Sequence, residues 1–266
     1  MNILHVITLG VIEGITEFLP ISSTFHLIFA SSLLGIKQDD FVKLFEVFIQ
    51  SGAILSVVLL YAQDVVKDKR LAVNVLVSFI PTAVIGLALH SFIKNVLFSS
   101  LLLMLTVFVC IGIVFIITEL LVKKGFIKQL KSVESLNYKE AIIIGLCQSL
   151  AIIPGVSRAG SVILAMMFLH YKRTDAARYS FLLSIPTIFA ASVLDALKMR
   201  HLLLSSSTNI GYLILGFIVA FISSFFVVKW LIKYLQHHSL AVFGWYRILL
   251  GTIFFIAIIT SLLRFS

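Results

Sequence analysis

Near its N-terminus the chain carries a run of chemically active side chains inside a strongly apolar segment: Glu13, Glu17, Ser22, Ser23, Thr24 and His26. Residues 1–36 contain no Lys or Arg, so these polar groups do not form a solvated charged face. Ionisable side chains in apolar surroundings are costly and usually mark a substrate or ion site. The run therefore predicts a functional site at membrane depth.

The two carboxylates of this run, Glu13 and Glu17, are spaced i,i+4 and share one face of a helix. Two bare carboxylates about 5.5 Å apart repel by about 3 kcal/mol at an effective dielectric constant of about 20. They must share a proton, face a cation or bind a metal. Hard oxygen ligands combined with a phosphate suit Mg²⁺ or Ca²⁺, so a divalent cation is the first interpretation. An ion pair between one Glu and a distant Lys or Arg is the alternative.

The hydroxyl residues and the imidazole follow a proline that breaks the helix. Ser22, Ser23 and Thr24 could cap the next helix. His26 lies about one helical turn after Ser23 and could act as a base, an acid or a nucleophile. The alternative is a structural imidazole beside capping hydroxyls. A capping role for one hydroxyl does not exclude catalysis by another.

A second polar motif, PGVSRAGS at residues 154–161, has the composition of an anion-binding loop. Gly155 and Gly160 let the backbone approach a ligand closely, and the next helix would direct its N-terminal amides at that ligand. Arg158 adds a guanidinium fork that matches phosphate oxygens. An Arg at membrane depth costs about 2.5–3.5 kcal/mol, so it needs a phosphate ligand or an ion pair with one of the two Glu residues.

The composition indicates that the chain is surrounded by lipid rather than by water. Hydrophobic residues make up 60% of the 266 residues and charged residues 12%, so a water-soluble fold would expose large apolar patches. The net charge of +9 fits anionic lipid headgroups and an anionic substrate, and it does not indicate nucleic acid, because Lys and Arg lie between apolar segments. Cys110 and Cys147 lie in apolar runs, which disfavours a disulfide or a metal cluster.

The apolar windows predict the architecture. Two regions, 1–36 and 139–171, are interrupted by Pro, Gly and hydroxyl residues, which fits two half-helices joined by an irregular loop buried in protein. We therefore expect an all-α integral membrane protein with six transmembrane helices and two re-entrant helix pairs. The windows long enough to cross about 30 Å of hydrocarbon are 41–62, 71–91, 98–122, 176–198, 209–232 and 243–264.

The two interrupted regions resemble each other, and each precedes three of the expected spans. Three is an odd number, so the second half must be inverted relative to the first. This predicts a single membrane domain of inverted repeats at about 1–122 and 139–266, with a linker at about 123–138. Gly14, Glu17, Leu19, Pro20 and Ser23 correspond to Gly145, Gln148, Leu150, Pro154 and Ser157.

The basic residues outside the spans predict the orientation. The side with more of them is expected to be cytoplasmic, which places both termini outside. The richer side holds Lys67, Lys69, Arg70, Lys123, Lys124, Lys128, Lys131, Lys139, Lys172, Arg173, Lys229 and Lys233. The poorer side holds Lys37, Lys43, Lys94, Lys198, Arg200 and Arg264. With this orientation the two interrupted loops enter from opposite sides and can meet near the midplane.

Taken together, these motifs resemble the bacitracin-resistance (BacA/UppP) family of undecaprenyl-diphosphate phosphatases over essentially the whole chain. EGITE (13–17) is similar to the family's (E/Q)xxxE motif, and FLPISSTFH (18–26) to the stretch that follows it. PGVSR (154–158) is similar to the start of the PGxSRSxxT motif. Three further segments also fit: FEVFIQSGAIL (45–55), YSFLLSIPT (179–187) and the Tyr246-Arg247 pair.

The resemblance implies interdigitated inverted repeats and hydrolysis of the terminal phosphate of undecaprenyl diphosphate, which regenerates the carrier for cell-wall synthesis. It implies a divalent cation, Mg²⁺ or Ca²⁺, and a site on the outer face of a bacterial cell membrane. The expected partners are the lipid substrate and the surrounding membrane lipids, and the resemblance leaves open whether the protein forms a homodimer. Glu13 and Glu17 would serve as metal ligands or base, and Ser23 or His26 as nucleophile or its partner. The phosphates would be held by Ser157 and Arg158, with Ser22, Thr24, Gly155 and Gly160.

Three residues depart from the family pattern. Phe25 stands where the family usually has Gly before its His, and we expect it to crowd the site or shift the loop. Ala159 and Val162 stand where the second motif has Ser and Thr, so two phosphate-facing hydroxyls are absent. Ser161 is a candidate replacement. These differences affect the expected rate and substrate preference more than the fold.

A transporter of polyprenyl phosphate is the alternative from another functional class. Inverted repeats with broken helices that meet at the midplane are typical of transporters. A carrier would need Arg158 and the helix N-termini, but it has less need of a Glu pair beside Ser and His. These residues therefore favour the enzyme.

Overall fold

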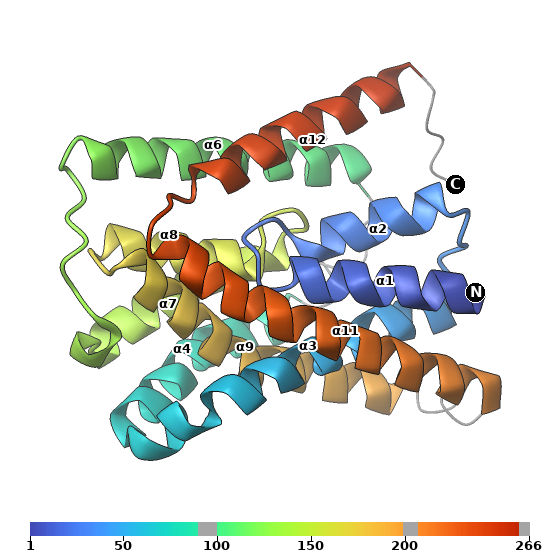
Figure 1. The fold of residues 1–266 in the computed structure, drawn as a ribbon, viewed down its shortest axis with the longest axis horizontal. Helices are drawn as coiled ribbons and strands as arrows, with labels where there is room; N and C mark the ends of the chain where they lie inside the picture. Colours follow the sequence, from blue (N-terminus) through green and yellow to red (C-terminus); the bar gives the residue numbers. More distant parts are fainter. Residues whose placement is uncertain (90–99, 199–206, 261–266) are drawn as a thin grey trace.

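A computed structural model describes residues 1–89, 100–198 and 207–260, and the chain is helical throughout these segments (Figure 1). They contain no β-strand, only one isolated bridge between Lys131 and Tyr171, so the expected all-α class is confirmed. The helices are α1 (Ile3–Thr16), α2 (Ser23–Leu33), α3 (Asp40–Lys67), α4 (Lys69–Ala88), α6 (Leu101–Lys123), α7 (Tyr138–Ser149), α8 (Arg158–Phe168), α9 (Arg173–Lys198), α11 (Ser207–Leu235) and α12 (Ala241–Ile259). Two 3-10 turns are η2 (Val133–Ser135) and η3 (Leu150–Ile152).

The described residues include six helices that are long and apolar enough to cross a membrane, namely α3, α4, α6, α9, α11 and α12. Each coincides with one of the expected spans, and the protein is a multi-pass membrane protein. The ends of three expected spans, at 90–91, 98–99 and 261–264, lie outside the described residues, as do Lys94, Arg200 and Arg264.

Short polar side chains mark where several helices begin. Asp39 accepts a hydrogen bond from the Val42 amide (2.8 Å) at the start of α3, and Asp68 accepts one from the Leu71 amide (3.0 Å) at the start of α4. Asp68 also closes α3, so the two helices are joined by a single residue. Such caps satisfy amide groups that have no partner within the helix.

The two interrupted apolar regions are broken helices, as the sequence predicts. α1 and α2 are separated by residues 17–22, which we call the first loop, and α7 and α8 by residues 150–157, the second loop. In each pair the second helix runs back toward the end of the molecule from which the first came, and both loops lie in its interior (Figure 1).

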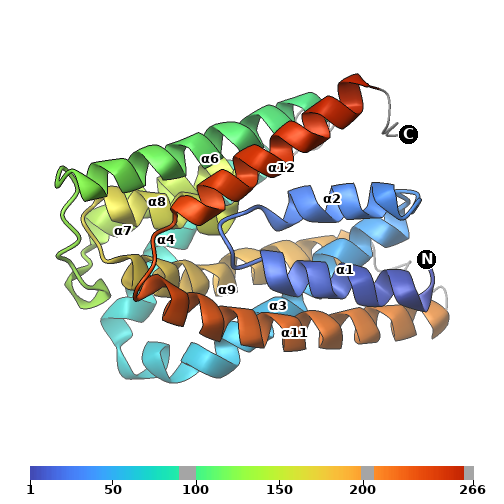
Figure 2. The same ribbon diagram turned by 45° about the horizontal axis from the view of Figure 1, so that its top comes forward.

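The halves of the chain interlock rather than sit side by side. α1 packs on α11, and α4 packs on α7, while α6 lies along α12 (Figure 2). Two glycines allow α1 to approach α11 closely and α7 to approach α4 closely. A Cβ atom on Gly14 would strike the carbonyl of Ala220 in α11, and one on Gly145 would strike the carbonyl of Ser78 in α4. Each broken pair therefore rests on a spanning helix from the other half.

The linker after α6 is held by ion pairs at one end of the molecule. Arg173 pairs with Glu119 of α6, and Lys131 of the linker pairs with Glu140 of α7 (2.6 Å). Tyr171 donates a hydrogen bond to the same carboxylate (2.7 Å). Burial raises the pKa of the Tyr171 phenol, and this hydrogen bond raises it further, so Tyr171 remains a donor at neutral pH.

Candidate active site

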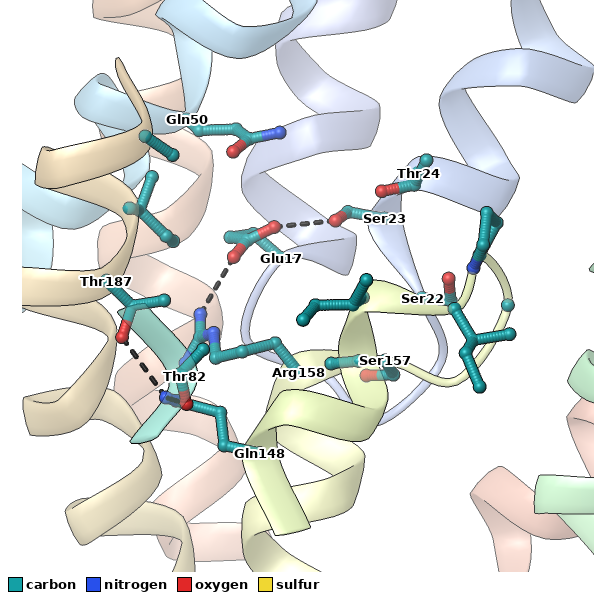
Figure 3. A pocket seen from close by; sticks show the side chains of 17 residues that line it. Glu17, Ser22, Ser23, Thr24, Gln50, Thr82, Gln148, Ser157, Arg158 and Thr187 are labelled. Carbon is teal, nitrogen blue, oxygen red and sulfur yellow. Dashed lines mark hydrogen bonds and ion pairs between the residues drawn. The ribbon is translucent and has the colours of Figure 1, made fainter. Parts of the chain in front are cut away.

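The tips of the two loops meet at a cavity of about 220 Å³ in the interior of the helix bundle (Figure 3). Glu17 of the first loop and Arg158 at the start of α8 form an ion pair of 2.7 Å across it. The polar residues that line the cavity are Glu17, Ser22, Ser23, Thr24, Gln50, Thr82, Gln148, Ser157, Arg158 and Thr187. The expected convergence of the two motifs is therefore present in the structure.

Glu17 is the centre of a short hydrogen-bonded chain (Figure 3). Its Oε2 accepts the hydroxyl hydrogen of Ser23 at 2.6 Å, and its Oε1 accepts from Nη2 of Arg158 at 2.7 Å. Nη1 of Arg158 donates to the Ser180 carbonyl (2.8 Å). Nε of Arg158 is buried with no hydrogen-bond partner in the described part of the chain. The arrangement gives Ser23 a proton acceptor and engages two of the five N–H donors of Arg158, while its Nε has no partner.

Both half-helices that follow the loops begin beside the cavity. α2 begins at Ser23 and α8 at Arg158, and both residues line the cavity. The unpaired amide groups at a helix N-terminus attract anions. Gly160 does not line the cavity, and its amide donates to Ser157 Oγ (3.1 Å), which caps α8. Two helix N-termini and a guanidinium thus surround one small cavity, which suits an anion with several oxygens.

The residue immediately before each half-helix is a serine in the left-handed region of the backbone. The φ angles are 67° for Ser22 and 77° for Ser157. Non-glycine residues pay about 1–2 kcal/mol to adopt such angles, and outliers of this kind gather at functional sites. Gly155, with φ 95°, packs against the Met104 carbonyl of α6, where no side chain fits.

The positive φ of Ser22 allows its effects on stability and on activity to be measured separately with Ser22→Gly. The Ser22 side chain lines the cavity and caps no helix. Because glycine accepts the positive φ freely, Ser22→Gly should change the unfolding free energy by less than about 1 kcal/mol. Ser22 is expected to bind substrate through its hydroxyl, so the loss of that hydroxyl should nevertheless raise KM several-fold. Thermal unfolding in detergent and steady-state kinetics measure the two effects. An unchanged KM would remove Ser22 from the binding residues.

Glu13 is fully buried, and it does not line the cavity. Both of its carboxylate oxygens have no hydrogen-bond partner among the described residues. The two Glu residues thus differ. Glu17 forms an ion pair with a distant Arg, which the sequence offers as the alternative to a bound cation, whereas the carboxylate oxygens of Glu13 are unpaired. A buried carboxylate in that condition needs a proton or a cation.

His26 is held away from Ser23 by two other partners. Its Nδ1 lies 2.8 Å from the Ser22 carbonyl, which can only accept, so Nδ1 carries the proton. Nε2 then accepts from the Tyr246 hydroxyl at 2.7 Å. His26 is absent from the cavity lining, and the structure pairs Ser23 with Glu17 rather than with His26.

The three departures from the family pattern lie outside the cavity lining. Phe25 is buried and stacks on Phe108 of α6, with ring centroids 3.8 Å apart, so it does not crowd the site as expected. Ala159 and Val162 are fully buried. Ser161 donates to the Arg158 carbonyl (2.9 Å) and does not line the cavity, so it replaces neither of the missing hydroxyls there.

Four polar residues of the lining were not predicted: Gln50, Thr82, Gln148 and Thr187. Gln148 donates to the hydroxyls of Thr82 (2.8 Å) and Thr187 (3.3 Å). One signal for Gln148 was available, because the internal repeat aligns it with Glu17. Gln50 and Thr187 lie in two of the segments that resemble the family, FEVFIQSGAIL (45–55) and YSFLLSIPT (179–187), whereas nothing in the local sequence distinguishes Thr82.

Comparison with known proteins agrees with this geometry. The model of the family described as bacitracin resistance protein BacA matches residues 6–253. A protein of Aquifex aeolicus named undecaprenyl-diphosphatase is 44% identical over 93% of this chain and 95% of its own length. Proteins with the same name from Wolinella succinogenes and a Sulfurihydrogenibium species are 45% and 43% identical, each over 96% of this chain and 97% and 99% of their own. The chain therefore belongs to the bacitracin resistance protein BacA family.

Proposed function

We propose that the chain is a membrane phosphatase that hydrolyses undecaprenyl diphosphate to undecaprenyl phosphate and inorganic phosphate. The observation that carries the proposal is the chain Ser23–Glu17–Arg158 at the edge of a cavity that two helix N-termini face. It combines a hydroxyl, a base and an anion-binding group within one small space. The products recycle the lipid carrier for peptidoglycan synthesis, and this recycling underlies bacitracin resistance.

In the proposed reaction Ser23 Oγ attacks the terminal phosphorus, and the bond from that phosphorus to the bridging oxygen breaks. Undecaprenyl phosphate leaves, and Glu17 takes the hydroxyl proton and passes it to solvent. Water then attacks the phosphoserine: its oxygen bonds to phosphorus, and the bond from phosphorus to Ser23 Oγ breaks. One water proton passes through Glu17 to Ser23 Oγ, and the other leaves with the inorganic phosphate. The 2.6 Å contact between Ser23 and Glu17 supports this assignment.

Arg158 has two partners in this scheme. In the substrate-free structure Arg158 binds Glu17 and the Ser180 carbonyl. The oxygens of an incoming diphosphate would compete with Glu17 for the guanidinium. When the guanidinium turns to the phosphate, Glu17 is released to take the proton of Ser23. Substrate binding itself thus activates the nucleophile.

The carboxylates also fit a divalent cation. Within the described residues no group of three or more His, Cys, Asp or Glu side chains converges, so Glu13 and Glu17 are the protein ligands in the proposal. Mg²⁺ is commonly held by one or two carboxylates together with substrate phosphates, and the unpaired oxygens of Glu13 support this role. When bound, Mg²⁺ or Ca²⁺ would neutralise charge on the diphosphate.

Removal of divalent ions should therefore slow phosphate release at least tenfold. Excess chelator should stop turnover by the purified protein, and added Mg²⁺ or Ca²⁺ should restore it, while Glu13→Gln should require more ion for the same rate. The measurement is the initial rate against free ion concentration. Full turnover in excess chelator would exclude the cation from the mechanism.

The membrane arrangement proposed here is an inverted repeat in a bacterial cell membrane, with re-entrant pairs α1–α2 and α7–α8 and both termini outside. Matching contacts support the repeat, since α1 packs on α11 as α7 packs on α4. The connections α3–α4, α6–α7, α8–α9 and α11–α12 lie at one end of the molecule (Figure 1), and most of the Lys and Arg residues lie in these connections or in the helix ends beside them. A homodimer stays a prediction.

Phosphate release from undecaprenyl diphosphate by the purified protein in detergent tests the function directly. Hydrolysis at the terminal phosphate, with undecaprenyl phosphate as the lipid product, is expected. Tight binding of the lipid without any phosphate release would instead favour a polyprenyl-phosphate transporter.

A further inference from the structure

Arg247 of α12 is the largest fully buried side chain of the described residues, and its guanidinium lies between the two loops. All of its hydrogen bonds go to backbone carbonyls. It donates from Nε to Phe108 (2.9 Å), from Nη1 to Pro20 (3.0 Å) and Val156 (3.3 Å), and from Nη2 to Gly155. One side chain thus holds the first loop, the second loop and α6 together.

Three of the four carbonyls that Arg247 holds belong to residues just before the two strained serines. Pro20 precedes Ser22 by two residues, and Val156 precedes Ser157 directly. A strained backbone angle persists only where the surroundings fix it. With these carbonyls fixed, the chain leaves both loops in the direction that brings Ser23 and Arg158 to the cavity.

The helix that carries Arg247, α12, packs very closely against α6. Gly112 of α6 and Gly244 of α12 pack so closely that a Cβ atom on either would strike the carbonyl of the other. The guanidinium also lies over the ring of Phe108, 4.5 Å from its centroid. α6 and α12 therefore act as one support, and any displacement of Arg247 would move both loops.

The chemistry of this contact demands arginine. A planar guanidinium presents five donors in a fixed fork, whereas a lysine ammonium presents three at one point. The four carbonyl acceptors, which lie on three separate segments, can all be reached by the five donors of a guanidinium but outnumber the three donors of an ammonium. A cation without a carboxylate partner is costly to bury, so this residue is not a default choice for packing. No Asp or Glu of the described residues lies within ion-pair distance of Arg247, whereas Arg158 pairs with Glu17.

We infer that Arg247 is a positioning residue for the hydrolysis: it sets the distance between the Ser23 nucleophile on one loop and the Arg158 phosphate-binding group on the other. It does not line the cavity and acts through the loops. The inference rests on the proposed function for its kinetic consequence, and on the geometry alone for its structural one.

The test compares Arg247→Lys with Arg173→Lys, a matched loss of a guanidinium from the Glu119 ion pair, which lies away from the cavity. Arg247→Lys should lower kcat for undecaprenyl diphosphate at least tenfold and change KM less than threefold, because geometry rather than binding is lost. Arg173→Lys should lower the unfolding midpoint without changing kcat. Equal kcat for Arg247→Lys and wild type would overturn the inference while leaving the proposed function intact.

Hydrogen–deuterium exchange provides a readout that does not depend on hydrolysis. In Arg247→Lys, peptides that contain the first and the second loop should both exchange at least tenfold faster, while peptides from α3 should not change. Arg173→Lys should leave both loops as in wild type. Faster exchange in only one loop, in neither, or equally throughout the protein would overturn the inference even if the wild-type protein proved inactive.

Discussion

Ser23→Ala is expected to lower phosphate release by at least about 10³-fold, or about 4 kcal/mol of transition-state stabilisation. The hydroxyl of Ser23 is the one that Glu17 contacts, at 2.6 Å, and it is the proposed nucleophile. Substrate affinity should change little, because the residues proposed to bind phosphate, Arg158 and Ser157, lie on another part of the cavity lining, at the start of α8. Steady-state kinetics together with lipid binding by the purified variant provide the measurement.

His26→Ala is the matched control, because the two candidate nucleophiles lie one helical turn apart. His26 contacts the Ser22 carbonyl and Tyr246 and does not line the cavity, so its removal should cost no more than about tenfold. A stronger loss in His26→Ala than in Ser23→Ala would reverse the assignment. Wild-type rates in both would exclude the first loop from the chemistry.

Glu17→Gln is expected to reduce kcat by about 10²–10⁴-fold, which is the usual contribution of a positioned general base. The amide cannot take the proton of Ser23, and it also leaves Arg158 without its counter-charge. Breaking a buried ion pair from one side typically costs about 3–5 kcal/mol of stability. The kinetics must therefore be read beside the thermal unfolding of the same preparation.

Glu17→Asp distinguishes a loss of catalysis from a loss of folding stability. It retains the charge that pairs with Arg158 and shortens the side chain by one methylene, which withdraws the base from Ser23. We expect a protein with nearly wild-type unfolding and a clearly reduced kcat. A fully active Glu17→Asp, or a folded Glu17→Gln with wild-type turnover, would show that Glu17 is not the base.

The sequence predicted the class and the spans of this fold well, because each depends on local composition. Six long apolar windows give six helices, and the prolines at 20 and 154 lie in the two breaks. The proposed repeat stays a prediction, and in it the sequence matches Ser23 with Ser157. The residues that share a positive φ and directly precede a half-helix are Ser22 and Ser157.

The site was predictable where a residue type is unusual for its surroundings. Glu17 and Arg158 stand out because charge is rare in apolar segments, and they meet as expected. Which side chain Ser23 would contact was not predictable, because Glu17 and His26 are both within reach of it along the chain. The roles of Tyr246 and Arg247 depend on contacts across more than 200 residues of sequence, to His26 and Pro20, that no local pattern encodes.

The interlocking of the halves also constrains the order in which this protein can be made. α1 rests on α11, so α1 cannot reach its final neighbour until α11, almost 200 residues later in the chain, has been synthesised. Contacts between distant segments form slowly, because a long loop must close first. Until α11 and α12 are inserted, the first loop lacks both its supporting helix and Arg247. The proposed nucleophile, Ser23, should therefore reach its final surroundings only after α12 has been made, and a nascent chain that lacks α12 should not hydrolyse the lipid.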